Sequence, residues 1–159
     1  MIINGYLIEP FADLSEADLS NTDLMGVNLS NAGLLFANLS KANLSKANLS
    51  KANLASADLS GAVLMAANLV KANLVKANLA GANMAIADLK RANLTGANLA
   101  GAMLFSADLE GAILVDADLT GADLNGANLA GADLTNVVLV NADLTEADFS
   151  GANLNGVVR

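Results

Sequence analysis

Residues 42–49 read Ala-Asn-Leu-Ser-Lys-Ala-Asn-Leu, which is one five-residue unit followed by the start of the next. Stepping by five from Ala12 to Val157 gives 30 positions, of which 26 hold alanine. The following position holds aspartate or asparagine in 24 of 30 units, and the position after that holds leucine in 27 of 29. No insertion or deletion breaks this register, so residues 12–158 form one uninterrupted repeat array.

A period of five residues fits neither an α-helix nor a single β-strand. Successive leucines would step about 140° around a helix and cover every face of it. In a straight strand an odd period sends each leucine to the face opposite the previous one. All the alanines and leucines share one side only if the chain turns after each short extended piece. The sequence therefore predicts an all-β solenoid whose interior holds both apolar columns.

The number of residues in one coil is indicated by a second periodicity. Gly61, Gly81, Gly101 and Gly121 recur at intervals of twenty, which favours four units per coil. A coil of fifteen residues would also accommodate the five-residue unit.

The column pattern of residues 42–49 resembles that of the pentapeptide-repeat protein family, and the resemblance extends over residues 12–158. It implies a right-handed, four-sided parallel β-helix of about seven coils, with four repeats in each coil. Members of this family are functionally diverse. Some resemble duplex DNA in size and negative charge, and bind type II topoisomerases, notably gyrase.

Composition excludes several kinds of chemistry. The 159 residues include no cysteine and no histidine, so disulfides, Cys/His zinc sites, thiol nucleophiles and histidine-based catalysis are ruled out. The net charge of −8 argues against direct binding to nucleic acid or to an anionic membrane. No segment has the ~20 apolar residues of a membrane helix or the features of a secretory signal. We expect a soluble cytoplasmic protein that is not an enzyme and uses no cofactor or metal.

The two ends of the array differ. Residues 1–11 break the repeat and are interpreted as an N-terminal capping segment, followed by the β-helix over residues 12–159. The capping segment carries the large apolar residues Ile2, Ile3, Tyr6, Leu7, Ile8 and Phe11. The C-terminal repeats have no such segment, and an open solenoid end exposes core and strand edges. We therefore expect a homodimer formed through the C-terminal coils.

An apolar group interrupts the polar columns in the middle of the array. With twenty residues per coil, one side would collect five large side chains from three adjacent coils, where an exposed apolar patch often marks an interface. These candidate interaction residues are Val63, Met65, Ile86, Met103 and Phe105. The alternative interpretation is sequence drift in a tolerant repeat.

Charge is segregated along the chain. Residues 36–91 carry seven basic and two acidic residues, whereas residues 92–159 carry nine acidic residues and one basic residue. One side of the array would collect a basic stripe that could bind an acidic partner, or that could simply be a solvated surface. The stripe comprises Lys51, Lys71, Lys90 and Arg91.

Two functions remain open at this point. The first is a non-enzymatic scaffold that binds an unknown protein partner through its outward columns. The alternative is a DNA mimic that binds gyrase, which the acidic rod favours and the basic middle segment weakens. Fold alone does not decide between them.

Overall fold

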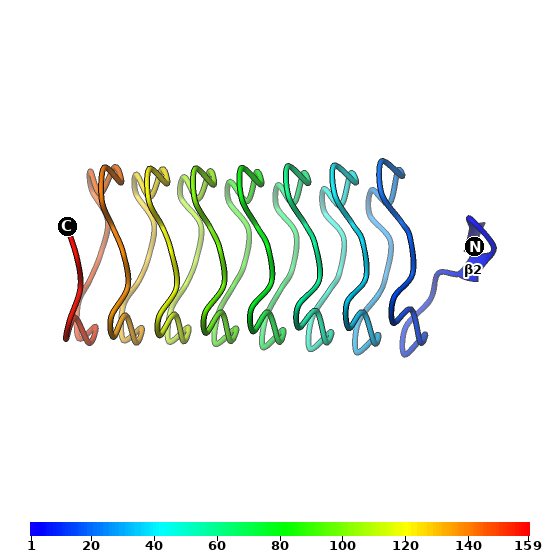
Figure 1. Ribbon diagram of the computed structural model, residues 1–159, viewed down its shortest axis with the longest axis horizontal. Helices are drawn as coiled ribbons and strands as arrows, with labels where there is room; N and C mark the ends of the chain where they lie inside the picture. Colours follow the sequence, from blue (N-terminus) through cyan, green and yellow to red (C-terminus); the bar gives the residue numbers. More distant parts are fainter.

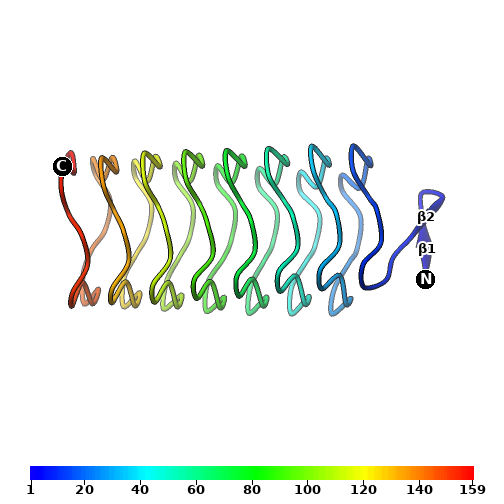
Figure 2. The ribbon, with the colours of Figure 1, turned by 90° about the horizontal axis from the view of Figure 1, so that it is seen from below.

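The computed structural model describes every residue from Met1 to Arg159. The chain winds into a rod of stacked coils with a small hairpin at its N-terminal end (Figure 1). A view turned by 90° shows the same regular stack, with the two termini at opposite ends (Figure 2). The structure contains no helix with the length and apolar character that a membrane span requires.

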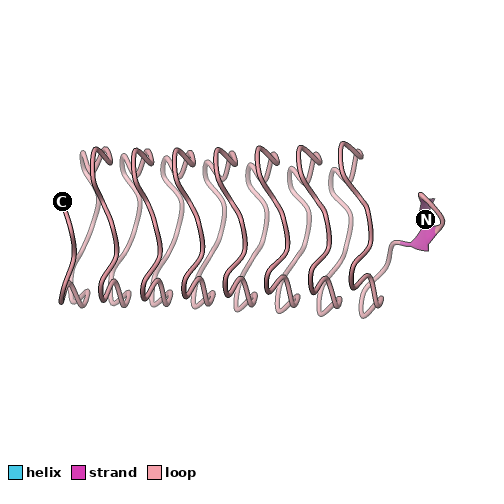
Figure 3. Cartoon of the chain, viewed as in Figure 1, coloured by secondary structure: helices cyan, strands magenta, loops and turns pink.

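Each coil contains twenty residues, which decides between the two coil sizes that the sequence allows. Parallel bridges join residues twenty apart along the whole array, from Asp13↔Gly33 to Val138↔Val158. Each of these pairings between coils is a β-bridge of a single residue, too short to count as a strand. Figure 3 therefore draws strands only in the N-terminal hairpin.

Two kinds of backbone hydrogen bond connect adjacent coils at each bridge. The N–H of Leu44 donates to the carbonyl of Val63 at 2.7 Å, and the N–H of Val63 donates to the carbonyl of Ala42 at 2.9 Å. The same pair recurs throughout the rod, so each coil is hydrogen-bonded to both neighbours. A single coil lacks these partners, and the stability of the rod therefore depends on stacking.

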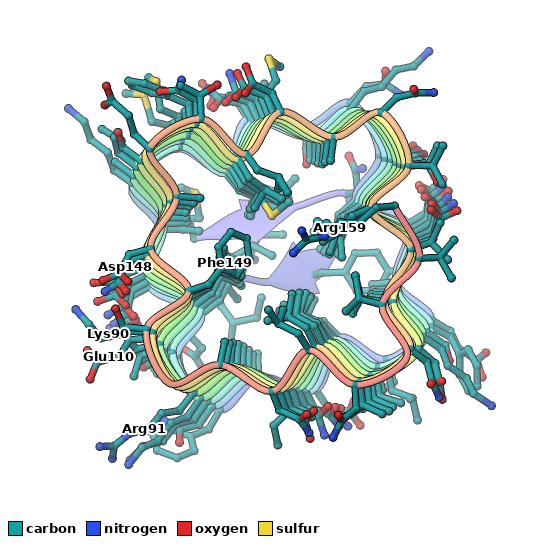
Figure 4. All side chains as sticks on the ribbon, turned by 90° about the vertical axis from the view of Figure 1, so that its left-hand side faces the viewer. Lys90, Arg91, Glu110, Asp148, Phe149 and Arg159 are labelled. Carbon is teal, nitrogen blue, oxygen red and sulfur yellow. The ribbon has the colours of Figure 1, made fainter.

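The rod has four sides, because each coil contains four repeats (Figure 4). Numbered in chain order, side 1 begins with residues 12–16, side 2 with 17–21, side 3 with 22–26 and side 4 with 27–31. Each side recurs every twenty residues. Side chains at equivalent positions therefore form columns along the rod, as Figure 4 shows.

A tight turn closes each corner. The N–H of Ala47 donates to the carbonyl of Leu44 at 3.0 Å, and the residue before the alanine, Lys46, has a positive φ of 59°. This geometry is that of a type II turn. The side-chain oxygen of Asn43 accepts the N–H of Ser45 at 3.2 Å, and the same contact recurs at most aspartates and asparagines of this column. The preference for these two residues follows from this contact.

The interior consists of the alanine and leucine columns, as the sequence predicts. Their side chains are buried through most of the rod, and Leu79 is completely inaccessible. Met84, which replaces leucine in this column, is equally buried. Neighbouring coils fill the interior with their own side chains, because the inward columns stack.

The N-terminal segment forms a β-hairpin of strands β1 (Ile2–Ile3) and β2 (Tyr6–Leu7). Asn4 and Gly5 connect the strands with φ values of 51° and 84°. Two consecutive positive φ angles define a type I′ turn, for which Asn-Gly is the strongest sequence signal. This hairpin was not predicted from the sequence, although the dipeptide marks it.

The hairpin directs only part of its apolar surface toward the rod. Ile3 and Tyr6 pack against the core and Ile8 is buried, whereas Ile2 and Leu7 face solvent. Strand pleating explains the difference, because the paired residues Ile2 and Leu7 project to one face and Ile3 and Tyr6 to the other. Phe11 is also exposed. The amide of Asn4 donates to the carbonyl of Asp18 at 3.2 Å and links the hairpin to the first coil.

Candidate interaction surface

The five apolar candidate residues lie on side 3, in three consecutive coils. Val63 and Met103 each bridge to Asn83, one from either neighbouring coil. The N–H of Ile86 donates to the carbonyl of Phe105 at 2.9 Å, so these two residues also occupy adjacent coils. We call the five residues Val63, Met65, Ile86, Met103 and Phe105 the side-3 patch.

Four members of the side-3 patch are substantially exposed. Ile86 is 54% accessible, and Met65, Met103 and Phe105 are between 41% and 47% accessible. Val63 is half-buried. The small side chain of Ala85 lies in the coil between Met65 and Phe105, so the patch presents two large side chains on either side of a small one. Flexible methionines beside an aromatic ring are typical of surfaces that adapt to a partner.

Ile86 adopts a backbone conformation that its side chain disfavours. Its φ is 53°, and it is the only β-branched residue among the non-glycine residues with positive φ. The corresponding corner positions elsewhere hold Gly, Asn, Lys and other unbranched residues. A β-branched residue in this region is a genuine outlier, since the left-handed conformation costs roughly 1–2 kcal/mol per L-residue. Ile86 is exposed, so burial of its side chain contributes little free energy to offset this conformational cost.

The side-3 patch borders a smooth corner of the rod. The corner between sides 2 and 3 carries glycine in four consecutive coils, namely Gly61, Gly81, Gly101 and Gly121. No atom lies within 4 Å of a Cβ built on Gly81, Gly101 or Gly121, so the space beyond this corner is open. The backbone at this edge of the patch is therefore accessible to close approach.

The structure places the four residues of the basic stripe on side 4, but in two different columns. Lys51, Lys71 and Arg91 occupy the corner column in three consecutive coils. Lys90 lies in the neighbouring column, where its Nζ is 2.6 Å from an oxygen of Asp108. The hydrogen bond to Asp108 raises the pKa of Lys90 above its usual value, with a further contribution from the charge of Asp88. Lys90 therefore belongs to a local ion-pair group, whereas the other three cations form no salt bridge. Figure 4 shows Arg91 pointing away from the rod.

Carboxylates and amides form a second system along the outward columns. Where an asparagine follows an aspartate one coil later, its amide donates to the carboxylate, as Asn43 does to Asp23 at 2.9 Å. Hydroxyl groups contact the same oxygens, as Thr145 does to Asp143 at 2.6 Å. The Thr145 hydroxyl and N–H lower the pKa of Asp143. Most of these carboxylates therefore serve the turns and the stacking of coils.

The structure contains no pocket and no group of three or more aspartate or glutamate side chains placed to hold a metal ion. Asp88 and Asp108 lie on adjacent coils, as their spacing predicts, and Lys90 is placed beside them. The pairing of Lys90 was missed at the sequence level. It could have been found from the twenty-residue period, which brings position 108 next to position 88.

Coils with four sides, each made of one five-residue unit, place this protein among the β-solenoids built from short repeats. The family model described as pentapeptide repeats (8 copies) matches four segments of the chain, residues 11–45, 47–85, 87–121 and 122–158. This chain therefore belongs to the pentapeptide-repeat family, whose members fold as right-handed quadrilateral β-helices. A search among curated proteins finds no significant match.

Two solved structures illustrate the relationship. HetL, a pentapeptide-repeat protein involved in heterocyst differentiation regulation from the cyanobacterium Nostoc sp. strain PCC 7120, is 30% identical with a TM-score of 0.61. The match covers 94% of this chain and 87% of HetL. A trypsin-treated form of QnrB1, a plasmid-mediated fluoroquinolone resistance protein, is 24% identical with a TM-score of 0.70. That match covers 93% of this chain and 77% of QnrB1, and it bears on the fold alone.

Proposed function

We propose that this protein is a non-enzymatic scaffold, a rod of about seven coils that binds a protein partner through the side-3 patch. The observation that carries the proposal is the conformation of Ile86. An exposed β-branched residue stands at a corner with φ of 53°, in the middle one of the three coils that carry the patch. Strained residues of this kind are retained where another requirement outweighs their cost. Contact with a partner supplies such a requirement.

The composition of the side-3 patch supports a protein partner in particular. Phe and Met are enriched in the buried centres of protein interfaces, whereas charged residues are depleted there. None of the five residues is charged, and the surrounding polar columns provide a rim. The backbone of side 3 repeats regularly from coil to coil, which holds the patch residues in register for contact with a macromolecule.

The relationship to HetL is compatible with a regulatory binding role. HetL is described as taking part in the regulation of heterocyst differentiation, and it shares the fold over 94% of this chain. A rigid repeat rod can serve regulation by presenting fixed columns of side chains to another protein. The partner of the present chain is a separate question, because outward columns differ among members of a repeat family.

We also propose a homodimer formed through the C-terminal coils. Inward side chains of the last coil, including Leu144 and Phe149, are partly exposed, and Leu154 is 37% accessible. Figure 4 shows Phe149 and Arg159 at this end of the rod. Pairing of two such ends would bury the apolar side chains and offer partners to strand edges. Light scattering should give twice the chain mass, and a strictly monomeric mass would refute the dimer.

Two further expectations belong to this proposal. Residues 1–11 act as a cap, because Ile3, Tyr6 and Ile8 cover the apolar end of the first coil. Truncation of this segment should lower the melting temperature of the rod, and an unchanged melting temperature would refute the capping role. The cytoplasmic location that the sequence favours stays a prediction, and cell fractionation would check it.

The DNA-mimic alternative is favoured by the acidic C-terminal part of the rod. Residues 92–159 carry nine acidic residues and one basic residue, and they are distributed over all four sides. Inhibition of gyrase supercoiling by the purified protein, above that of an acidic control protein, would support this alternative. No inhibition at tens of times the enzyme concentration would eliminate it.

The scaffold proposal is tested by comparative pull-down from cells that express the protein naturally. The variant Met65→Ser/Phe105→Ser removes the two large side chains that flank Ala85, and the control Phe36→Ser removes an exposed phenylalanine on side 1. We expect a specific protein to be retained by the wild type and by Phe36→Ser, and to be lost from the double variant. Equal retention by all three proteins would contradict the proposal, provided that their circular dichroism spectra agree.

A further inference from the structure

We infer that the partner of side 3 is a linear peptide segment of another protein, in which apolar residues are followed by lysine or arginine residues. The inference rests on the proposed function and specifies the chemistry of its partner. It follows from what lies beside the side-3 patch. Toward the C-terminal end of the rod, side 3 changes from apolar to acidic, with Asp123, Asp143 and Glu146 in the next two coils.

The apolar and acidic parts form one continuous surface. Met103 bridges to Asp123, and Asp123 bridges to Asp143, so the three residues occupy one column in three successive coils. Bridged strands are about 4.8 Å apart, which places Asp143 roughly 10 Å along the rod from Met103. An extended peptide covers this distance in about three residues, at ~3.3 Å per residue. Met65 lies four coils, or about 19 Å, from the coil of Asp143, so an extended segment of about seven residues could contact both.

The carboxylates of Asp123 and Asp143 have no counter-charge within the chain. The single salt bridge of the structure joins Lys90 and Asp108 on side 4. The only cation on side 3 is Lys46, which precedes the patch. A partner with basic residues at the acidic end would complement this surface, whereas a partner with acidic residues there would be repelled.

Asp123 and Asp143 form one of two bridged pairs in which both outward residues are aspartates; the other, Asp88 and Asp108, has Lys90 beside it. On the same side, the side-chain amide of Asn43 donates a hydrogen bond to the carboxylate of Asp23. This bond stabilises the negative charge of Asp23 and links the two neighbouring coils. At Asp123 and Asp143 both members are carboxylates, so no amide donor lies between them. Like charges on adjacent strands repel each other. A lysine or arginine from the partner would remove this repulsion.

The geometry leaves one oxygen of each carboxylate free for a ligand. Oδ1 of Asp123 accepts the N–H of Asn125 at 3.0 Å. Oδ1 of Asp143 accepts the N–H and the hydroxyl of Thr145 at 2.9 and 2.6 Å. No hydrogen bond within the chain involves the second oxygen, Oδ2, of either residue. The turns therefore hold both carboxylates in fixed orientations, with an acceptor available to a basic side chain.

The test uses a phage-displayed library of random 16-residue peptides, selected against the full-length protein at low salt. Affinities of the selected peptides are then measured by fluorescence anisotropy against the wild type and two charge variants. Asp123→Asn/Asp143→Asn removes the acidic pair and keeps the Oδ1 acceptors. Asp118→Asn/Asp148→Asn is the matched control, because it removes the same charge from sides 2 and 4.

We expect selected peptides to contain an apolar cluster followed by lysine or arginine. Loss of the acidic pair should weaken their binding about two- to thirtyfold at 50 mM salt, because two exposed ion pairs are lost. The difference should nearly vanish at 0.5 M salt, where screening is strong. The control variant should bind as the wild type does.

Three results would overturn the inference. Peptides without basic residues, equal weakening by the control variant, or binding that is unchanged by Asp123→Asn/Asp143→Asn would each show that the acidic pair does not select the partner. The proposed function is tested separately with Met65→Ser/Phe105→Ser. If the peptides lose binding to that variant only, the patch does bind protein, but the inference that its partner carries basic residues is wrong. If no selected peptide distinguishes it from the wild type, both proposals fail.

Discussion

The backbone N–H of Ile86 donates to the carbonyl of Phe105 at 2.9 Å, so their exposed side chains are fixed on adjacent coils of side 3. The same ladder of hydrogen bonds runs through the whole rod. The backbone thus holds these two large apolar side chains on adjacent coils. The same backbone geometry occurs where the corresponding residues are small and polar, so the fold does not require large apolar side chains here.

Replacement of Ile86 by glycine should stabilise the protein. The substitution removes a β-branched side chain from a left-handed conformation, a gain of roughly 1–2 kcal/mol, which the greater flexibility of glycine offsets by about 0.5–1 kcal/mol. We expect the melting temperature to rise by up to about 6 °C, since the net gain is at most about 1.5 kcal/mol and 1 kcal/mol corresponds to about 2–4 °C in a protein of this size. Partner binding should weaken at the same time. A melting temperature several degrees lower, measured by calorimetry, would show that Ile86 is a structural residue.

Introduction of a charge into the leucine column should disrupt the middle of the array. Leu79 is completely buried, and a buried unpaired carboxylate costs several kcal/mol, so Leu79→Asp should unfold the central coils. The matched control is Lys71→Asp, which places the same carboxylate at an exposed corner. Circular dichroism and thermal melts check the prediction. An unchanged melting temperature for Leu79→Asp would contradict the inward orientation of leucine.

Acid should destabilise the rod through its hydroxyl-bonded aspartates. Hydrogen bonds from serine or threonine two residues later lower the pKa values of Asp13, Asp18, Asp133, Asp143 and Asp148. A depressed pKa in the folded state contributes stability above the unfolded value of about 3.9, and this contribution is lost as pH falls through the folded value. Melting temperature should therefore decline below about pH 4. A constant melting temperature down to pH 2 would contradict this assignment.

The role of a single hydroxyl can be isolated at Asp143. Thr145→Val keeps the shape of the side chain and removes the 2.6 Å hydrogen bond to the carboxylate. The pKa of Asp143, followed by NMR titration, should move up toward its ordinary value. Thr95→Val is a suitable control, because the Thr95 hydroxyl bonds to Asn93, which does not titrate.

The ion pair of side 4 should matter mainly at low salt. Lys90→Met leaves Asp88, Asp108 and Glu110 close together without a cation, and like charges then repel across adjacent coils. We expect a lower melting temperature than for the wild type at 10 mM salt, and a smaller difference at 1 M salt, where the Debye length is about 3 Å. A difference that does not depend on salt would indicate lost packing of the lysine stem instead.

The sequence predicts most of this fold, because each repeat column has one physical role. The inward position of leucine follows from the five-residue period alone, and the buried Leu79 confirms it. The choice between fifteen and twenty residues per coil could not be made from the unit itself, because both preserve an inward leucine. The bridges between positions twenty apart make that choice, and the recurring glycines point the same way.

The surface was harder to predict, because it depends on contacts between coils. The five members of the side-3 patch could be placed on one side once the coil length was assumed. The conformation of Ile86 could not be read from its residue type, since its φ is set by the corner position. Lys90 was grouped with Lys51 and Lys71, although it lies in another column and pairs with Asp108. The Asn4-Gly5 turn lies outside the repeat, so the column pattern does not predict it, although Asn-Gly is typical of a type I′ hairpin turn.

Site-specific photocrosslinking tests the central claim most directly. Benzoylphenylalanine would replace Phe105 in the side-3 patch and, separately, Phe36 on side 1, in cells that express the protein naturally. Both phenylalanines are exposed, at 47% and 58% accessibility, so both probes can reach a neighbouring molecule. The scaffold proposal predicts a discrete crosslinked protein from position 105 that is absent from position 36. The same crosslinked products from both positions, or none from position 105, would contradict it.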